Sequence, residues 1–100
     1  MIINASIQVV PLTEIPVAFP IVDRAIELIQ KSGLKYTVGA FETLIEGEYE
    51  QVQQLLRQVE DFCYSQKELQ FLVYSKLHLS GGVDIFAEDK TGKFKQALLL

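Results

Sequence analysis

The chain has little cysteine and no long apolar run, and each absence excludes a class of protein. Cys63 is the only cysteine in 100 residues, which excludes an intramolecular disulfide, a cysteine-rich zinc site and a Cys-x-x-Cys redox pair. No window approaches 18 uninterrupted apolar residues, and no positive charge precedes an apolar run at the N-terminus. We therefore expect a cytoplasmic protein with no membrane span and no metal site.

Positive charge is also scarce. Nine Lys and Arg residues against 13 Asp and Glu residues leave a net charge of −4 and a pI near 4.9. The basic residues are scattered along the chain, so no stripe of them is available to bind a phosphate backbone. We expect no nucleic-acid partner and no membrane partner, and the acidic balance favours a cationic ligand.

The residues that are present suffice for one folded domain. A hydrophobic fraction of 49% and a charged fraction of 22% are typical of a globular chain. A chain of 100 residues supports one hydrophobic core. We expect residues 1–100 to form a single domain, with a core over about 1–80 and a C-terminal extension over about 81–100.

The first third of the chain predicts a strand followed by a helix. Apolar Ile3, Ala5, Ile7 and Val9 alternate with Asn4, Ser6, Gln8 and Val10, which is the period of a half-buried strand that Pro11 ends. An amphipathic helix follows, because apolar residues recur at i, i+3, i+4 and i+7 from Val22 to Ile29. Its start is open between Pro16 and Pro20, and Gly33 is its natural stop.

The rest of the chain predicts a hairpin, a second helix and a long strand. LKYTV (34–38) and AFETLIEG (40–47) read as two strands that meet at Gly39. Residues 52–62 carry apolar side chains at helical spacing, and residues 69–79 are rich in β-branched and aromatic residues. One more short helix is possible over about residues 88–97.

The resulting order, β-α-β-β-α-β, predicts an α+β ferredoxin-like fold, with two helices on one face of a four-stranded antiparallel sheet. The other face is then left uncovered, and it is partly apolar. A small core with such a face favours pairing with a second subunit, so we expect a homo-oligomer. The residues expected on that face are Asn4, Ser6, Gln8, Val10, Tyr74, Lys76 and His78.

No group of residues predicts catalysis. His78 is the single histidine and has no partner in the sequence pattern, and no serine stands in a nucleophile motif. Cys63 falls on the second helix beside Phe62, where cysteine usually acts as a small apolar side chain. The Gly81-Gly82 pair lacks the spacing of a phosphate-binding loop. We expect no enzymatic activity and no catalytic residue.

Glu46 is the carboxylate that stands out. It ends the largely apolar run FETLIEG, whereas Glu48 and Glu50 fall at the start of a helix, where the helix dipole accounts for them. An ionised carboxylate there could accept strong hydrogen bonds from a cationic ring or an aminopyrimidine. The alternative is a plain carboxylate at the end of a strand.

Three segments resemble a known family. ASIQVVPL (5–12), SGLKY (32–36) and especially AFETLIEGEYEQVQQLL (40–56) are similar to the small thiamine-binding proteins. The resemblance covers about the first eighty residues. It implies a ferredoxin-like fold, assembly through the sheets into a dimer or homotetramer, and binding of thiamine or its hydroxymethylpyrimidine part without turnover.

The resemblance also implies which residues bind the ligand. Ser6 and Gln8 on the first strand, and Thr43 and Glu46 in the FETLIEG segment, match positions of the family pattern. Tyr36 could stack on a pyrimidine or thiazolium ring, or it could simply pack in the core or an interface. We expect no other cofactor. The alternative function is a structural or regulatory protein-interaction domain without a small-molecule ligand.

Overall fold

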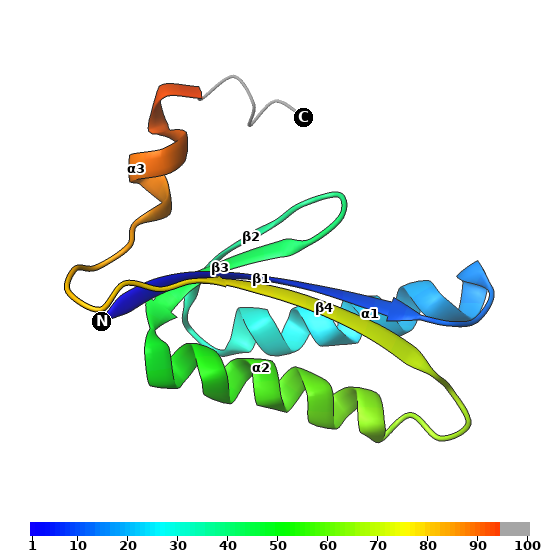
Figure 1. Cartoon of the computed structure of the whole chain (residues 1–100). Helices are drawn as coiled ribbons and strands as arrows, with labels where there is room; N and C mark the ends of the chain where they lie inside the picture. Colours follow the sequence, from blue (N-terminus) through cyan, green and yellow to red (C-terminus); the bar gives the residue numbers. More distant parts are fainter. Residues whose placement is uncertain (95–100) are drawn as a thin grey trace.

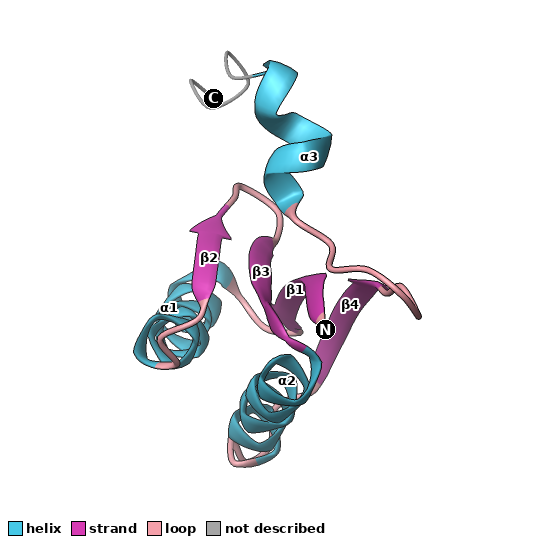
Figure 2. Cartoon of the chain, turned by 90° about the vertical axis from the view of Figure 1, so that its left-hand side faces the viewer, coloured by secondary structure: helices cyan, strands magenta, loops and turns pink. Residues whose placement is uncertain are grey.

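The computed structural model describes residues 1–94. Within them, seven elements follow one another: β1 (Ile2–Pro11), α1 (Ile15–Lys31), β2 (Lys35–Val38), β3 (Thr43–Glu48), α2 (Tyr49–Tyr64), β4 (Phe71–His78) and α3 (Ala87–Thr91). The first six have the predicted ferredoxin-like order, so that fold prediction is confirmed. Helices α1 and α2 lie under one face of the sheet, and α3 stands over the opposite face (Figure 1; Figure 2).

The four strands form one antiparallel sheet in the order β2-β3-β1-β4. Ala5 on β1 lies opposite Ile45 on β3, and Asn4 lies opposite both Glu46 on β3 and His78 on β4. Directly opposed residues point to the same side of a sheet. The register therefore turns Ala5 and Ile45 toward the helices, and it turns Asn4, Glu46 and His78 toward the other side, which we call the open face.

The hydrophobic core fills the space between the sheet and its two helices. Helix α1 contributes buried residues spaced three or four apart, and α2 does the same, so each helix turns one apolar stripe to the sheet. Val52 and Val59 on α2 are completely buried. The buried residues of this core are Ile3, Ala5, Ile7, Ala25, Ile29, Ile45, Val52, Leu55, Leu56 and Val59.

The residues at each end of α1 explain where the helix begins and where it ends. Pro16 occupies the first turn, where a missing N–H group costs no hydrogen bond, and Pro20 lies inside the helix, so the earlier of the two possible starts is the real one. The hydroxyl of Ser32 donates to the carbonyl of Ile29 at 2.6 Å. Gly33 follows with a φ of +79°, which confirms it as the stop, because side chains with a Cβ rarely adopt that conformation.

The hairpin between β2 and β3 begins its turn at Gly39, as predicted. The Gly39 N–H donates to the carbonyl of Glu42 at 2.9 Å, and a Cβ at Gly39 would lie 2.7 Å from that same oxygen. This closed turn delays the start of β3 to Thr43, three residues later than the expected strand. The fourth strand is likewise shorter than expected at each end, because pairing with β1 runs from Phe71 to His78.

The chain after β4 returns across the open face. Ile85 N–H donates to the carbonyl of Ile2 at 2.9 Å, and Ile2 N–H donates to Asp84 Oδ1 at 2.8 Å. Helix α3 then starts at Ala87 and is shorter than the expected 88–97 helix, with one tighter 3₁₀ turn leading to Phe94. Positions 95–97 of that expectation lie outside the described residues.

Candidate ligand-binding site on the open sheet face

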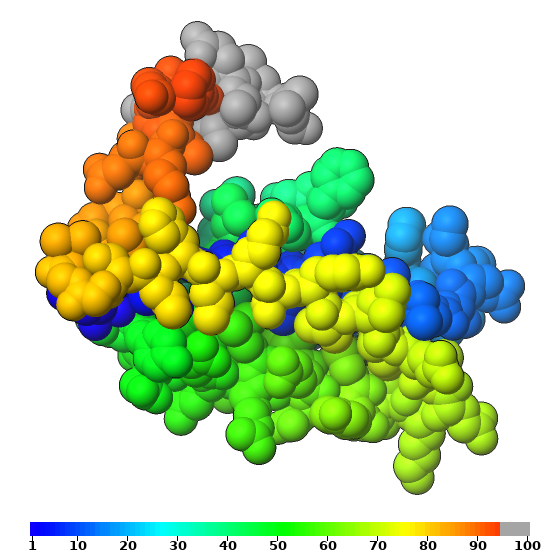
Figure 3. Space-filling view, viewed as in Figure 1, coloured from blue at the N-terminus to red at the C-terminus, as the bar shows by residue number. Residues whose placement is uncertain are grey.

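A cavity of about 780 Å³ lies between the open face and α3. Its sheet side comes from β1, β3 and β2, and its other wall comes from residues 87–94. In the space-filling view the orange segment that contains α3 stands clear of the green β2–β3 hairpin, with a hollow between them (Figure 3). A cavity of this size is in the usual range for small-molecule sites.

Asn4 and Glu46 form the polar floor of this cavity. They meet because β1 and β3 pair in a register that places one opposite the other, on the face away from the helices. The Asn4 side-chain Nδ2 donates to Glu46 Oε1 at 3.0 Å and to the carbonyl of Ile85 at 3.2 Å. Asn4 is buried, and the Glu46 side chain is only 13% exposed.

Glu46 stays ionised in spite of its burial. Desolvation is the largest influence on the carboxyl group and raises its pKa. The Ala87 N–H, which donates to Oε1 at 2.6 Å, and the Asn4 amide both lower the pKa, and the Lys35 ammonium 3.7 Å from Oε2 lowers it further. Together the contributions that lower the pKa exceed the effect of desolvation, so the pKa of Glu46 lies below its ordinary value of 4.5.

The walls of the cavity mix apolar and charged side chains. Leu44 is 43% exposed and Phe94 is 58% exposed, so both present apolar surface from opposite sides, one from β3 and one from the end of the α3 segment. The remaining polar lining residues are Lys35 and Thr37 on β2, with Glu88, Lys90 and Thr91 on α3. Lys90 Nζ lies 2.8 Å from Nδ1 of His78, so it also links α3 to β4.

The structure brings together only some of the residues predicted to bind a ligand. Glu46 lines the cavity with its side chain. Tyr36 borders the cavity as part of β2, but it pairs with Ile45, so its side chain points to the helix-covered side. Ser6 and Gln8 share the open face with Glu46 but lie one and two rows farther along β1, outside the cavity lining. Thr43 points to the helix-covered side, because it pairs with Ile7, and it is buried there. The five candidates therefore do not form one cluster.

Ser6 is buried in the middle of the sheet. It lies on β1 between Leu44 of β3 and Lys76 of β4. Lys76 Nζ reaches Glu42 Oε2 at 3.5 Å, and because β1 separates β4 from β3, this contact has to cross β1. Ser6 is only 5% exposed, and its hydroxyl has no hydrogen-bond partner within residues 1–94.

Asn4, Lys35 and the residues of the α3 segment were not among the residues predicted to bind a ligand. Asn4 was expected on the uncovered face, but nothing in the sequence marks its pairing with Glu46. Alternation shows which way a side chain points, whereas the strand register and the return of residues 84–94 depend on contacts far apart in sequence. The signal that could have found Asn4 is that it shares one strand face with Ser6 and Gln8, the two candidates on the first strand.

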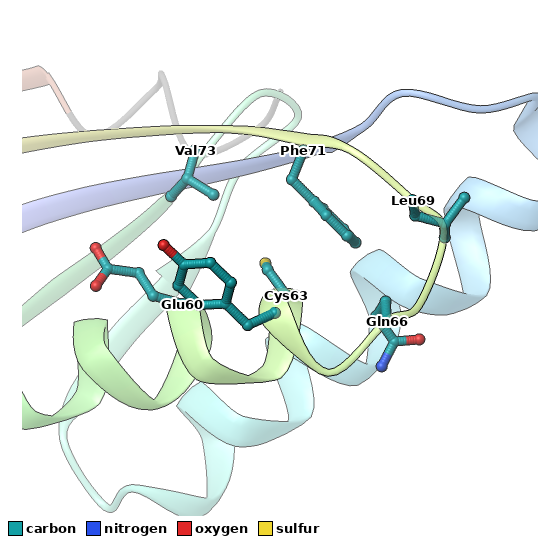
Figure 4. Close-up of a pocket in the computed structure, with 7 residues that line it drawn as sticks. Glu60, Cys63, Gln66, Leu69, Phe71 and Val73 are labelled. Carbon is teal, nitrogen blue, oxygen red and sulfur yellow. The ribbon is translucent and has the colours of Figure 1, made fainter.

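A second cavity lies on the helix side, between the end of α2 and β4 (Figure 4). It measures about 460 Å³, and Cys63 points into it toward Phe71 and Val73. Burial raises the pKa of the Cys63 thiol, and the charge of Glu60 raises it further. A thiol held protonated in this way is a poor nucleophile, in keeping with a packing role.

The described residues hold neither a cluster of metal ligands nor a membrane-spanning helix. Within residues 1–94, no three His, Cys, Asp or Glu side chains are grouped so that they could hold a metal ion. Over the same described part of the chain, no helix is long and apolar enough to cross a membrane.

A comparison with sequence families decides the relationship. The profile described as "Thiamine-binding protein" matches residues 5–95. The chain belongs to the thiamine-binding protein family. The matched region of this family member begins at Ala5 on β1 and includes every residue that lines the cavity on the open face except Asn4.

Individual relatives agree with this membership. The thiamine-binding family chain is 28% identical over 93 residues to a UPF0045 protein of Clostridium perfringens, with 92% of this chain and 96% of that protein aligned. A solved structure of a proposed thiamine biosynthesis/salvage protein of Thermotoga maritima matches with a TM-score of 0.84 at 30% identity, covering 94% of this chain and 99% of that one. A domain of unknown function (DUF77) from Bacillus cereus matches at 0.82 with 28% identity, covering 94% and 90%.

Proposed function

We propose that this protein binds thiamine, or its hydroxymethylpyrimidine part, in the cavity between the open face and α3. The observation that carries the proposal is the ionised carboxylate of Glu46 at the floor of that cavity, in a chain of the thiamine-binding protein family. An ionised carboxylate is the natural acceptor for the exocyclic amine of an aminopyrimidine and the natural counter-charge for a thiazolium.

The walls suit the rest of such a ligand. Its two aromatic rings need apolar or aromatic surface, which Leu44 on β3 and Phe94 at the end of the α3 segment supply from opposite sides. A cationic ring gains further from contact with an aromatic face. The two candidates farther along β1, Ser6 and Gln8, extend the same face and would contact the ligand only if it reaches beyond the cavity.

The proposal is for binding without turnover and without another cofactor. Glu46 is the carboxylate best placed to take a proton from a ligand, but two hydrogen bonds to Oε1 hold it in its ionised form. A carboxylate with a lowered pKa is a weak base. Glu46 is therefore better suited to accept a hydrogen bond from the ligand than to remove a proton from it.

Isothermal titration calorimetry with thiamine, and separately with hydroxymethylpyrimidine, tests the proposal. We expect saturable binding, and we expect Glu46→Gln to weaken it about tenfold or more, since a hydrogen bond to a charged group contributes roughly 1.5–3 kcal/mol. Glu50→Gln is the matched control, because it removes the same charge from an exposed position on α2.

The outcomes separate the two functional hypotheses. Unchanged affinity in Glu46→Gln would remove Glu46 from the site. Absence of heat with both ligands, from protein shown to be folded, would favour the protein-interaction domain instead.

We also propose that the protein self-associates through the part of the open face that the cavity leaves free. Leu72 and Tyr74 on β4 point to that face, beside Val10 and Gln8, and they are 45% and 56% exposed. Exposed apolar surface of this kind on a small domain favours a second copy as its cover. Sedimentation velocity should give a dimer or tetramer, and Tyr74→Glu should shift it toward monomer, while a monomeric parent protein would refute the proposal.

A further inference from the structure

The segment Asp84–Phe94 is attached to the open face by polar contacts and hardly by apolar packing. None of the residues of α3 is buried, and Phe86 and Phe94 are 43% and 58% exposed. The chain leading to it, residues 79–83, is mostly exposed. Because the segment buries so little apolar surface, we expect its free energy of local unfolding to be low.

Two of its polar attachments converge on the floor of the cavity. Asn4 Nδ2 donates to the Ile85 carbonyl, and the Ala87 N–H donates to Glu46 Oε1. Asn4 Nδ2 also donates to the same Glu46 oxygen, so both amide hydrogens of Asn4 are in use. We call this arrangement of Asn4, Glu46, Ile85 and Ala87 the clasp.

The orientation of the Asn4 amide is set by the clasp. Reversing it would place Oδ1 against a carboxylate oxygen and a carbonyl oxygen, which repel it. In the observed orientation Oδ1 is buried and has no hydrogen-bond partner within residues 1–94. An acceptor left unpaired in a buried position indicates that the two donor bonds determine where the amide lies.

We infer that Asn4 is a positioning residue: it holds the Glu46 carboxylate and, in the same step, closes the segment Asp84–Phe94 as a lid over the ligand. The lid supplies the second wall of the cavity through Ala87, Glu88, Lys90 and Phe94, so a ligand on Glu46 contacts it directly. Ligand binding and lid closure then stabilise each other. This coupling rests on the proposed function, whereas the clasp itself exists without a ligand.

Hydrogen exchange of the backbone amides of residues 85–94 tests the clasp in ligand-free protein. We expect Asn4→Leu to accelerate exchange there about tenfold, because it removes the bond to the Ile85 carbonyl and also the donor that holds Glu46, the acceptor of the Ala87 N–H. Asp84→Ala should accelerate it about threefold, since it removes only the bond from Ile2 N–H and lies outside the cavity lining.

Asp89→Ala is the matched control. It removes the same charge from the same segment, and the Asp89 side chain makes no hydrogen bond or ion pair within the described residues. Exchange over 85–94 should be unchanged in this variant. Equal exchange in the parent protein and Asn4→Leu would overturn the clasp. If Asn4→Leu fails to fold, Glu46→Gln gives the same test, because it weakens the bond that the Ala87 N–H donates to the carboxylate.

Thiamine is the probe for the coupling. At about 100 times its dissociation constant it should slow exchange of the lid amides in the parent protein by at least tenfold, because a ligand that binds only the closed lid stabilises that state by mass action. Saturating thiamine that leaves lid exchange unchanged would overturn the lid. If the parent protein binds no thiamine, both the proposed function and the coupling are wrong. The exchange rates of the ligand-free variants still show whether the clasp holds the segment.

The pH profile of binding separates positioning from a merely structural role. Asn4 is one of the donors that keep the pKa of Glu46 low. Its removal should shift the acid limit of thiamine binding to higher pH in Asn4→Leu, while Asp84→Ala should leave that limit in place. An unshifted limit in a folded Asn4→Leu protein would contradict the positioning role.

Discussion

The two faces of one sheet differ in almost every physical respect. Toward the helices, β3 presents Ile45, which is 2% exposed within a dry apolar core. Toward the other side, its neighbours Leu44 and Glu46 face a cavity with a charged floor and a thinly packed cover. Because side chains alternate along a strand, a single strand serves both environments. The packing that stabilises the fold is therefore concentrated on one face, and the proposed ligand site lies on the other.

Truncation of neighbouring residues gives the largest difference between the faces. Ile45→Ala opens a void in the packed core and should lower the free energy of unfolding by about 2–5 kcal/mol. Leu44→Ala removes half-exposed surface and should cost well under about 1 kcal/mol, yet it should weaken thiamine binding because Leu44 lines the cavity. Urea unfolding and calorimetry measure the two effects, and equal losses of stability would contradict the division.

The helix-covered face was largely predictable from the sequence, because apolar alternation in β1 and helical spacing in α1 and α2 are local patterns. The floor of the cavity was predictable only in part. Glu46 stood out as a carboxylate in an apolar run, but its pairing with Asn4 follows from the strand register, and its contact with Ala87 spans 41 positions. Such contacts depend on where distant segments meet, which local patterns do not encode.

Acid should weaken the open face through protonation of Glu46. The pKa of Glu46 is lowered in the folded protein, so its contribution to stability is present above the ordinary value of 4.5 and is lost as pH falls through the lowered pKa. Lys35, Glu88 and Lys90 are the other charged groups around this cavity. The stability advantage of the parent protein over Glu46→Gln should shrink as pH drops below about 4.5. Urea unfolding across that pH range measures the difference in stability between the two proteins. A difference that does not change with pH would contradict the lowered pKa of Glu46.

Substitution of Thr43 should have the smallest effect on thiamine affinity, and it tests on which face of the sheet the ligand binds. The family pattern makes it a ligand-binding candidate, whereas the structure buries it on the helix-covered side. Thr43→Val keeps its shape and removes its hydroxyl. If the ligand occupies the cavity on the open face, thiamine affinity should stay within about twofold of the parent value by calorimetry, since no direct contact is lost. A tenfold loss would bring Thr43 into the site and question the location proposed for it.

The location of the ligand is the central claim, and a titration of ¹⁵N-labelled protein with thiamine, followed by NMR, tests it most directly. We expect the largest shift changes at the backbone amides of Asn4, Lys35, Glu46 and Ala87, on both walls of the cavity. Changes centred on Cys63 and Phe71 in the helix-side cavity, or no changes at all, would contradict that claim.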